Sequence, residues 1–158
     1  MLDLSVFTYQ GYRVGVMCLM LNFGITLAAM YVLPQFYQNA MLIAVAAAGV
    51  LMLPGGLINA AVSVAAGTLF DRFGARGPVS IGFACSALAS AMLMIATPET
   101  PIWYMVACHI IMMIGVPLAM SPCQTHALAS IPPQLNSDGS TITVSYTHLR
   151  AHETVLDL

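Results

Sequence analysis

Residues 67–77 read GTLFDRFGARG, and they form a charged cluster between two long apolar runs. Three charged side chains, Asp71, Arg72 and Arg76, lie within six positions, whereas no charged residue occurs between Arg13 and Asp71. Glycine and proline follow the acidic residue closely, which is typical of a tight turn. We therefore expect a short charged hairpin that joins two apolar helices.

The composition indicates a membrane protein. The 158-residue chain is 59% hydrophobic and 6% charged, and its mean hydropathy is +0.88. Soluble domains carry about 25% charged residues, so a chain with this little charge cannot cover itself with polar surface in water. The net charge is −2 and the sequence contains no lysine. We therefore expect no basic face and no nucleic-acid partner.

Four apolar segments are candidates to cross a bilayer, which takes about 20 helical residues. The predicted spans are residues 14–33, 40–70, 79–96 and 102–120. The second span contains the sequence LPGG at 53–56, and each half is too short to cross alone, so we predict one kinked helix. The predicted connections are a surface lead-in at 1–12, turns at 34–39 and 97–101, and a polar connection at 121–140.

The charges predict an orientation for these spans. If the spans alternate in direction, Arg13, Arg72 and Arg76 lie on one side of the membrane and Glu99 lies on the other. Basic residues collect on the cytoplasmic side. We therefore expect a multi-pass protein of the cell (inner) membrane with its N-terminus and the 67–77 loop in the cytoplasm.

The pattern G-x-L-x-D-R-x-G-x-R resembles the cytoplasmic signature loop of the major facilitator superfamily of transporters. There the loop joins the second and third helices of a six-helix repeat. The resemblance implies an all-α membrane protein whose four transmembrane helices form a partial major-facilitator repeat. It also implies a conformational gate that holds the cytoplasmic side shut, formed by Gly67, Asp71, Arg72, Gly74 and Arg76. The competing interpretation is a solvated hairpin that only sets the topology.

Three further stretches are similar to the fourteen-helix drug:proton antiporter branch, at about helices nine to twelve. They are PQFYQ at 34–38, LPG at 53–55 and IPPQL at 131–135. The resemblance implies that residues 1–143 are a partial membrane domain of a proton-coupled multidrug efflux antiporter. Its partners would be the lipid bilayer, a hydrophobic substrate, protons and the missing helices of the same chain. The alternative is a small four-helix structural or assembly protein without transport activity.

Polar residues inside the predicted spans are few, so each is a functional candidate. We predict that Asn22, Asn59, His109 and Met113 line a substrate or proton pathway. His109 is a titratable group well inside a span, on a face rich in methionine. Methionine suits a wall that accepts varied apolar ligands, although a methionine-rich helix is more often ordinary core.

The sequence offers little for catalysis or metal binding. The spans contain no Ser-His-carboxylate set and no H-E-x-x-H motif, and Cys123 and His126 are a lone pair. We therefore expect no enzyme activity, no cofactor and no metal site. Residues 144–158 resemble a translated sequencing-adapter read-through, so we treat them as extraneous. Within them His148 and His152 have a spacing that suits a metal on a helix, but no third ligand accompanies them.

Overall fold

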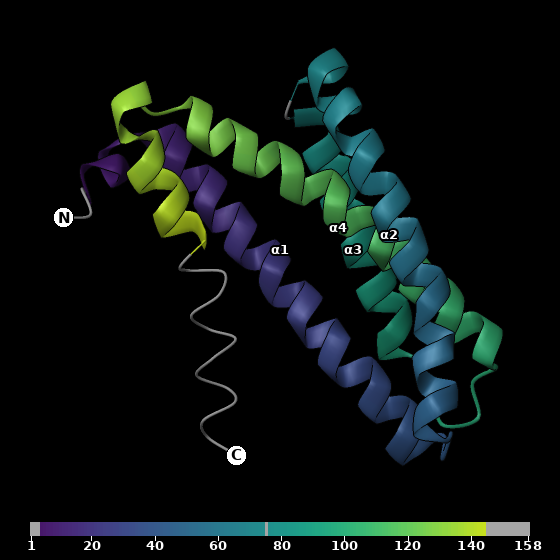
Figure 1. The fold of residues 1–158 in the computed structure, drawn as a ribbon. Helices are drawn as coiled ribbons and strands as arrows, with labels where there is room; N and C mark the ends of the chain where they lie inside the picture. The colour runs from purple at the N-terminus through teal and green to yellow at the C-terminus, as the bar shows by residue number, and fades with distance from the viewer. Residues whose placement is uncertain (1–3, 75, 145–158) are drawn as a thin grey trace.

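A computed structural model describes residues 4–74 and 76–144, and within them it contains helices and no strand (Figure 1). The elements are η1 Leu4–Thr8, α1 Gln10–Gln35, η2 Phe36–Ala40, α2 Val45–Phe73, α3 Arg76–Met94, α4 Ile102–Ala129 and η3 Pro133–Leu135. A further helical segment follows at residues 136–144. The predicted all-α class is confirmed.

Four of these helical segments are long and apolar enough to cross a membrane. They are Gln10–Ala40, Val45–Phe73, Arg76–Met94 and Ile102–Ala129. This confirms the predicted number of transmembrane helices, and α2 continues through Pro54 as a single helix. The helices extend beyond most of the predicted span ends, so the depth at which each one enters the hydrocarbon stays a prediction.

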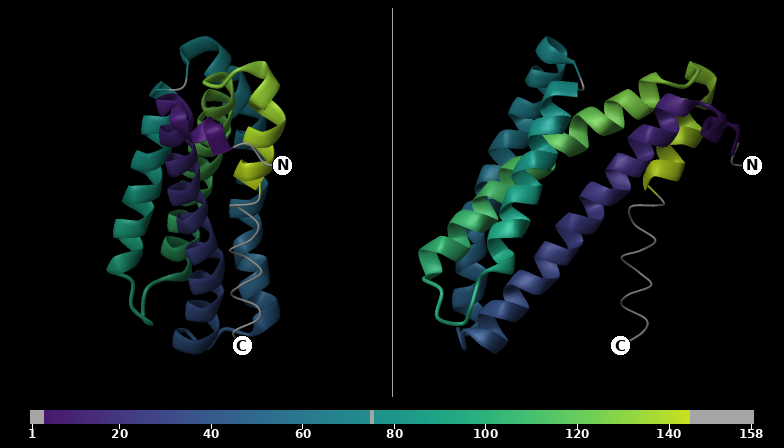
Figure 2. Two further views of the ribbon diagram at one scale, coloured as in Figure 1. Left: turned by 90° about the vertical axis from the view of Figure 1, so that its left-hand side faces the viewer. Right: turned by 180° about the vertical axis from the view of Figure 1, so that it is seen from behind.

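The central element is α4, which contacts each of the other three long helices. In the most apolar 18-residue stretch of α4, 56% of the residues are buried. In the corresponding stretch of α2, 11% are buried. A helix that is apolar on all sides packs inside a bundle. In Figures 1 and 2, α4 starts beside α2 and α3 and ends beside the N-terminal half of α1. The chain thus forms a group of three helices and one more distant helix, α1, joined through α4.

The turn predicted at 34–39 is wrong, because these residues are helical. Pro34 lies inside α1, and the chain continues as the π-helix η2 before it turns at 41–44. The Asn39 Nδ2 atom donates a hydrogen bond of 2.7 Å to Oε1 of Gln35, one turn earlier. Hydrocarbon offers no water to an open backbone, so a membrane helix continues past a proline and re-satisfies its carbonyls locally.

The polar connection predicted at 121–140 is also wrong over most of its length. The helix α4 continues to Ala129, and residues 136–144 are helical again. The reason lies in tertiary packing. Cys123 and Ala127 are buried, and a Cβ placed on Gly15 of α1 would lie 2.7 Å from the Ala127 side chain. Small residues on both helices allow this close contact, which stabilises the last turns of α4.

The buried side chains form two cores. The larger one joins the C-terminal half of α1, η2, α2, α3 and α4 up to Val116, and it includes Leu33, Tyr37 and Met112. The smaller one joins η1, the start of α1, the end of α4 and the segment after α4, and it includes Val6, Tyr12, Val16, Ala127, Ile131 and Ile142. The Tyr12 hydroxyl donates a hydrogen bond of 2.8 Å to the carbonyl of Gly139. The lead-in and the segment after α4 therefore pack on each other.

Candidate functional site

The charged loop between α2 and α3 is short. The last residue of α2 is Phe73, and Gly74 follows with a φ of 70° while its N–H donates to the carbonyl of Phe70 at 2.8 Å. A positive φ strongly favours glycine, because a Cβ would be strained there. The helix α3 begins at Arg76. Gly74 is therefore the residue that lets the chain reverse between the two helices.

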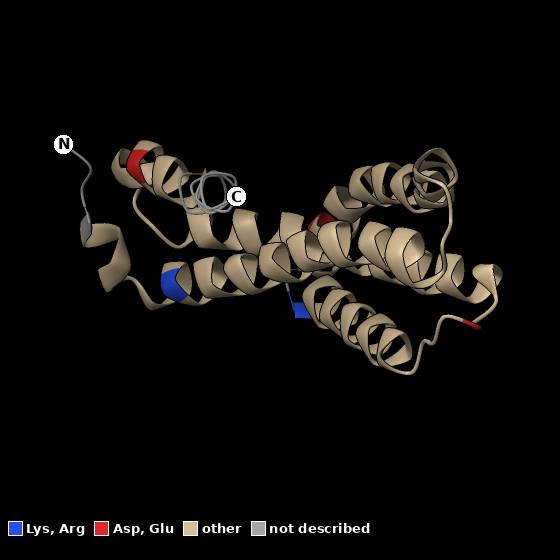
Figure 3. Cartoon of the chain, turned by 90° about the horizontal axis from the view of Figure 1, so that it is seen from below, with Lys and Arg blue, Asp and Glu red and all other residues tan. Residues whose placement is uncertain are grey.

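The three charged side chains of this loop are all exposed. Among the described residues, no ion pair joins Asp71 to Arg72 or Arg76. Figure 3 shows how sparse charges are along the rest of the helices. A Cβ on Gly67 would meet nothing within 4 Å, so that glycine faces open space. The predicted loop residues thus lie together at one end of the bundle, and their charges face outward.

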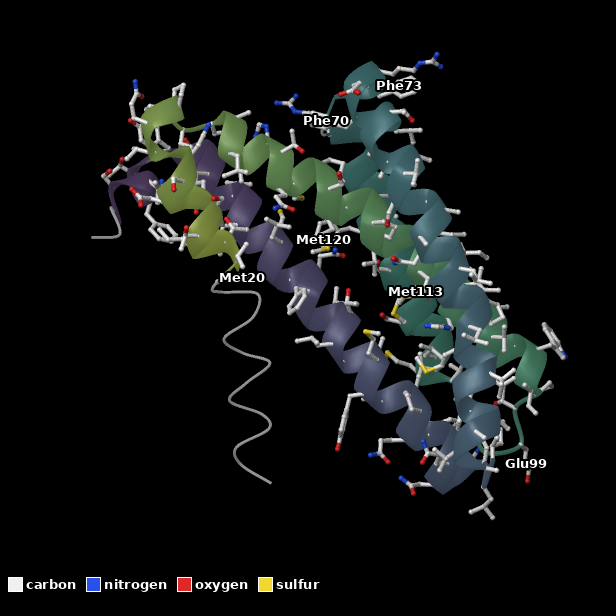
Figure 4. All side chains as sticks on the ribbon, viewed as in Figure 1. Met20, Phe70, Phe73, Glu99, Met113 and Met120 are labelled. Carbon is white, nitrogen blue, oxygen red and sulfur yellow. The ribbon has the colours of Figure 1, made fainter. Side chains whose placement is uncertain are left out.

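The loop and Glu99 lie at opposite ends of α2 and α3. Figure 4 shows Phe70 and Phe73 at the loop end and Glu99 near the other end. Residues 97–99 are exposed and join α3 to α4. This arrangement separates Glu99 from the basic loop residues, as alternating helices require.

A second group of predicted residues meets beside Pro117, a proline inside the continuous helix α4. Pro117 has no N–H, so the Met113 carbonyl loses its usual partner within the helix. The Asn59 amide nitrogen lies 3.4 Å from that carbonyl oxygen and 3.7 Å from the Met113 sulfur. The Asn22 amide donates to the Val116 carbonyl at 3.0 Å. Residues from α1 and α2 therefore contact α4 beside its missing hydrogen bond; Figure 4 shows Met113 where α4 passes α2.

His109 lies one turn before Met113 on α4 and is 3% exposed. Its Nδ1 atom has no hydrogen-bond partner. The ring packs directly against Gly55 of α2, where an added Cβ would overlap Nδ1 and come within 2.5 Å of Cε1. The Oδ1 atom of Asn22 is likewise buried without a partner. Two polar atoms of the predicted pathway residues are therefore buried without hydrogen-bond partners.

An apolar groove of about 320 Å³ runs between α1 and α3, and Met112 of α4 lies at its floor. Its walls are Ile25, Ala28, Ala29, Val32 and Leu33 from α1 and Ser90, Leu93 and Met94 from α3. Sequence reasoning missed this groove. Its one available signal was the methionine-rich face of α4, and the spacing between α1 and α3 is set by packing that no local pattern encodes.

No group of three or more His, Cys, Asp or Glu side chains is placed to hold a metal ion within 4–74 and 76–144. The predicted His148 and His152 pair lies outside the described residues.

The fold and its apolar helices define a multi-pass α-helical membrane protein. A sequence profile described as Major Facilitator Superfamily matches residues 3–149, which is most of the chain. The chain therefore belongs to the Major Facilitator Superfamily. Members of this family are transporters.

The similar proteins include several named for drug resistance. The lincomycin resistance protein LmrB of Listeria innocua is 34% identical over 142 residues, which is 90% of this chain and 30% of that protein. LmrB of Bacillus subtilis is 29% identical over 142 residues, which again is 90% of this chain and 30% of that protein. The multidrug resistance protein Stp of Mycobacterium tuberculosis is 26% identical over 85% of this chain and 25% of its own length. No solved structure gives a significant match. The chain spans about 30% of the length of the LmrB proteins.

Proposed function

We propose that this chain is part of a proton-coupled antiporter that exports hydrophobic drugs across the cell membrane. The observation that carries the proposal is the 34% identity to a lincomycin resistance protein over 90% of the chain. In this proposal residues 1–143 form a partial membrane domain, and the bilayer, the drug, protons and the remaining helices of the transporter are its partners. The tail from residue 144 is extraneous.

The loop between α2 and α3 is the proposed gate. Gly74 allows the chain to reverse in this loop. The Asp71 side chain is exposed, and it has no ion-pair partner in the described part of the chain. An exposed carboxylate at a helix end is free to bind an arginine or a helix N-terminus of another element, where the partial positive charge favours it. Such a contact forms in one state of the transporter and breaks in the other. Arg72 and Arg76 are placed to bind an acidic group in the same way.

The proposed pathway uses the buried polar atoms near the middle of the bundle. Binding sites of transporters of this kind lie near the bilayer midplane. The donor groups of Asn22 and Asn59 already contact α4. Asn22 Oδ1 is left to accept a hydrogen bond from a substrate, and His109 is the titratable group that is left to bind a proton. Met113 and the apolar groove add adaptable contact surface for a hydrophobic molecule.

The orientation follows from the separation of charges. We place the N-terminus and the α2–α3 loop in the cytoplasm, because Arg13, Arg72 and Arg76 share one side under alternating helices. Glu99 lies at the opposite end and faces outward. The alternative of a stand-alone structural bundle is not favoured, since similarity to transporters covers about 90% of the chain.

The test is gradient-driven transport by the full-length protein that contains this sequence, reconstituted in liposomes. We expect an imposed pH gradient to drive accumulation of at least one antibiotic from a panel that includes lincomycin. A protonophore should abolish the accumulation, because it removes the driving force. A folded protein that binds these drugs but moves none of them under any gradient would refute the proposal.

A further inference from the structure

We infer that Asn59 of α2 replaces the backbone donor that Pro117 removes from α4, and that Asn59 and Asn22 are positioning residues for the bend of this central helix. What the bend does during transport rests on the proposed function. The inference about the bend itself does not, because it concerns a hydrogen bond within the described chain.

The first step concerns the Met113 carbonyl. In a regular helix it would accept the N–H of the residue four positions later, which here is Pro117. The proline ring also clashes with that carbonyl and tilts it off the helix axis. A tilted, unpaired carbonyl in hydrocarbon is costly unless another donor reaches it. The Asn59 amide is the side-chain donor that lies within 3.5 Å of it.

The second step concerns the geometry of that contact. The separation of 3.4 Å between Asn59 Nδ2 and the Met113 oxygen is at the long end for a hydrogen bond. The same nitrogen also lies 3.7 Å from the Met113 sulfur. Ser63 donates to the Asn59 carbonyl at 2.7 Å, a back-bond that tends to bend a helix. The contact between Asn59 and α4 is therefore a long hydrogen bond.

The third step concerns Asn22, which binds α4 from the other side. Its amide donates to the Val116 carbonyl at a shorter distance of 3.0 Å, and the residue is fully buried. The two asparagines therefore bind carbonyls in the turn that precedes Pro117, Asn22 from α1 and Asn59 from α2. The stronger contact attaches α4 to α1.

The fourth step concerns what α4 packs on at either side of Pro117. Before it, His109 packs on Gly55 of α2; after it, Ala127 packs on Gly15 of α1. The contact with α2 through Gly55 thus lies before Pro117 and the contact with α1 through Gly15 lies after it, while Gly82 of α3 packs on both Gly115 and Ala119, one on each side of the proline. Figure 2 shows α4 leaving α2 and α3 in its C-terminal half.

The experiment is a double-substitution cycle in the full-length transporter in lipid nanodiscs. Asn59→Leu removes the donor, and Pro117→Ala restores the backbone N–H that makes the donor unnecessary. Spin labels at the exposed Val64 of α2 and Thr125 of α4 report the distance between the two helices. The measured quantity is the ratio of the population at the native distance to the population at a displaced distance. With Pro117 present, we expect Asn59→Leu to lower this ratio about threefold to twentyfold, which corresponds to the strength of interhelical hydrogen bonds in membranes.

In the Pro117→Ala background the same substitution should leave the ratio almost unchanged. Asn39→Leu is the matched control, since the Asn39 amide binds Gln35 and not α4; it should show no coupling to Pro117. An equal effect of Asn59→Leu in both backgrounds would overturn the inference and reduce Asn59 to packing. The distance measurement does not require transport, so its result is independent of the proposed activity.

A second readout covers the case in which Asn59→Leu does not fold. Isotope-edited infrared spectroscopy of a labelled Met113 carbonyl reports its hydrogen bonding directly. We expect the milder Asn59→Ser substitution to move this band to higher frequency, and Pro117→Ala to move it back. A band that is the same with and without the Asn59 amide would contradict the inference.

Discussion

At the scale of single residues, two neighbouring glycines of α2 have opposite surroundings. Gly55 packs against the His109 ring, whereas a Cβ on Gly56 would meet nothing within 4 Å. Both lie in the same helix, just after Pro54. The pair therefore separates the effect of a methyl group on helix propensity from its effect on the contact between α2 and α4.

We predict that Gly55→Ala destabilises the protein and Gly56→Ala does not. A methyl group at Gly55 must displace the buried imidazole, and overpacking of this kind costs about 1–3 kcal/mol. At Gly56 the same change removes a glycine from a helix interior and is neutral or mildly stabilising. The measurement is the thermal unfolding temperature of the two purified variants. Equal unfolding temperatures would mean that His109 is not held where the structure has it.

The polar residues near the middle of the bundle could be found from sequence, but their partners could not. Asn22, Asn59 and His109 are conspicuous because polar side chains are rare in apolar spans. That Asn59 reaches the Met113 carbonyl depends on where α2 crosses α4. The missing N–H of Pro117 was visible in the sequence; the donor that compensates for it was visible only in three dimensions. The pathway role of all four predicted residues stays a proposal.

At the scale of elements, the most extensive helix contact lies between α3 and α4. A Cβ on Gly82 would lie 2.6 Å from the Gly115 carbonyl oxygen and 2.6 Å from the Ala119 nitrogen. Small residues let the backbones of membrane helices approach this closely. The hydroxyl of Ser86 is buried in the same contact, beside Gly115. This contact fixes α3 against the central helix.

Substituting Gly82 should therefore separate the two helices. We predict that Gly82→Ala lowers stability by about 1–3 kcal/mol, because the added methyl group meets backbone that cannot move aside cheaply. Gly49→Ala in α2 is the control, since nothing lies within 4 Å of its Cβ position. Resistance to unfolding by denaturing detergent compares the two variants. A Gly82→Ala protein as resistant as the control would contradict the packing described above.

The number of long helices could be predicted from sequence, but several of their ends could not. Polar side chains and proline made 34–39 and 121–140 resemble connections. Both regions are largely helical, because a bilayer penalises an open backbone and because the end of α4 packs on α1. The second cause depends on Gly15, which lies more than a hundred positions away from Ala127 in the sequence. Local pattern carries no information about such a partner.

At the scale of the whole molecule, the two ends of the bundle should face opposite sides of the membrane. We predict that Asn39→Cys and Glu99→Cys, in a background without the native cysteines, react with an impermeant thiol reagent added to intact cells. Phe73→Cys should not react, because the proposed orientation places the α2–α3 loop in the cytoplasm. Phe73 is 72% exposed, so burial would not explain a lack of reaction. Permeabilised cells provide the control, in which all three variants should react.

The opposite labelling pattern would reverse the proposed orientation. Labelling of all three positions in intact cells would show that the helices do not alternate across the membrane as drawn here. Either result would also remove the cytoplasmic placement on which the proposed gate depends.

The central claim is that one loop, held by Gly74 and carrying Asp71, gates a drug exporter. Asp71→Asn keeps the shape of the side chain but removes its charge, and charge-assisted hydrogen bonds are about twice as strong as neutral ones. At an exposed helix end this loss should shift the balance between outward-facing and inward-facing states about two- to fivefold.

The most direct test measures equilibrium drug binding and proton-driven efflux on the same purified full-length protein, with and without Asp71→Asn. We predict that drug binding is retained, because the buried polar groups lie far from the loop, and that efflux falls, because one state of the cycle is depleted. Asp71→Glu, which retains the charge, should lose less efflux than Asp71→Asn. Unchanged efflux by the Asp71→Asn protein would contradict the account and leave the loop as a hairpin that only sets the topology.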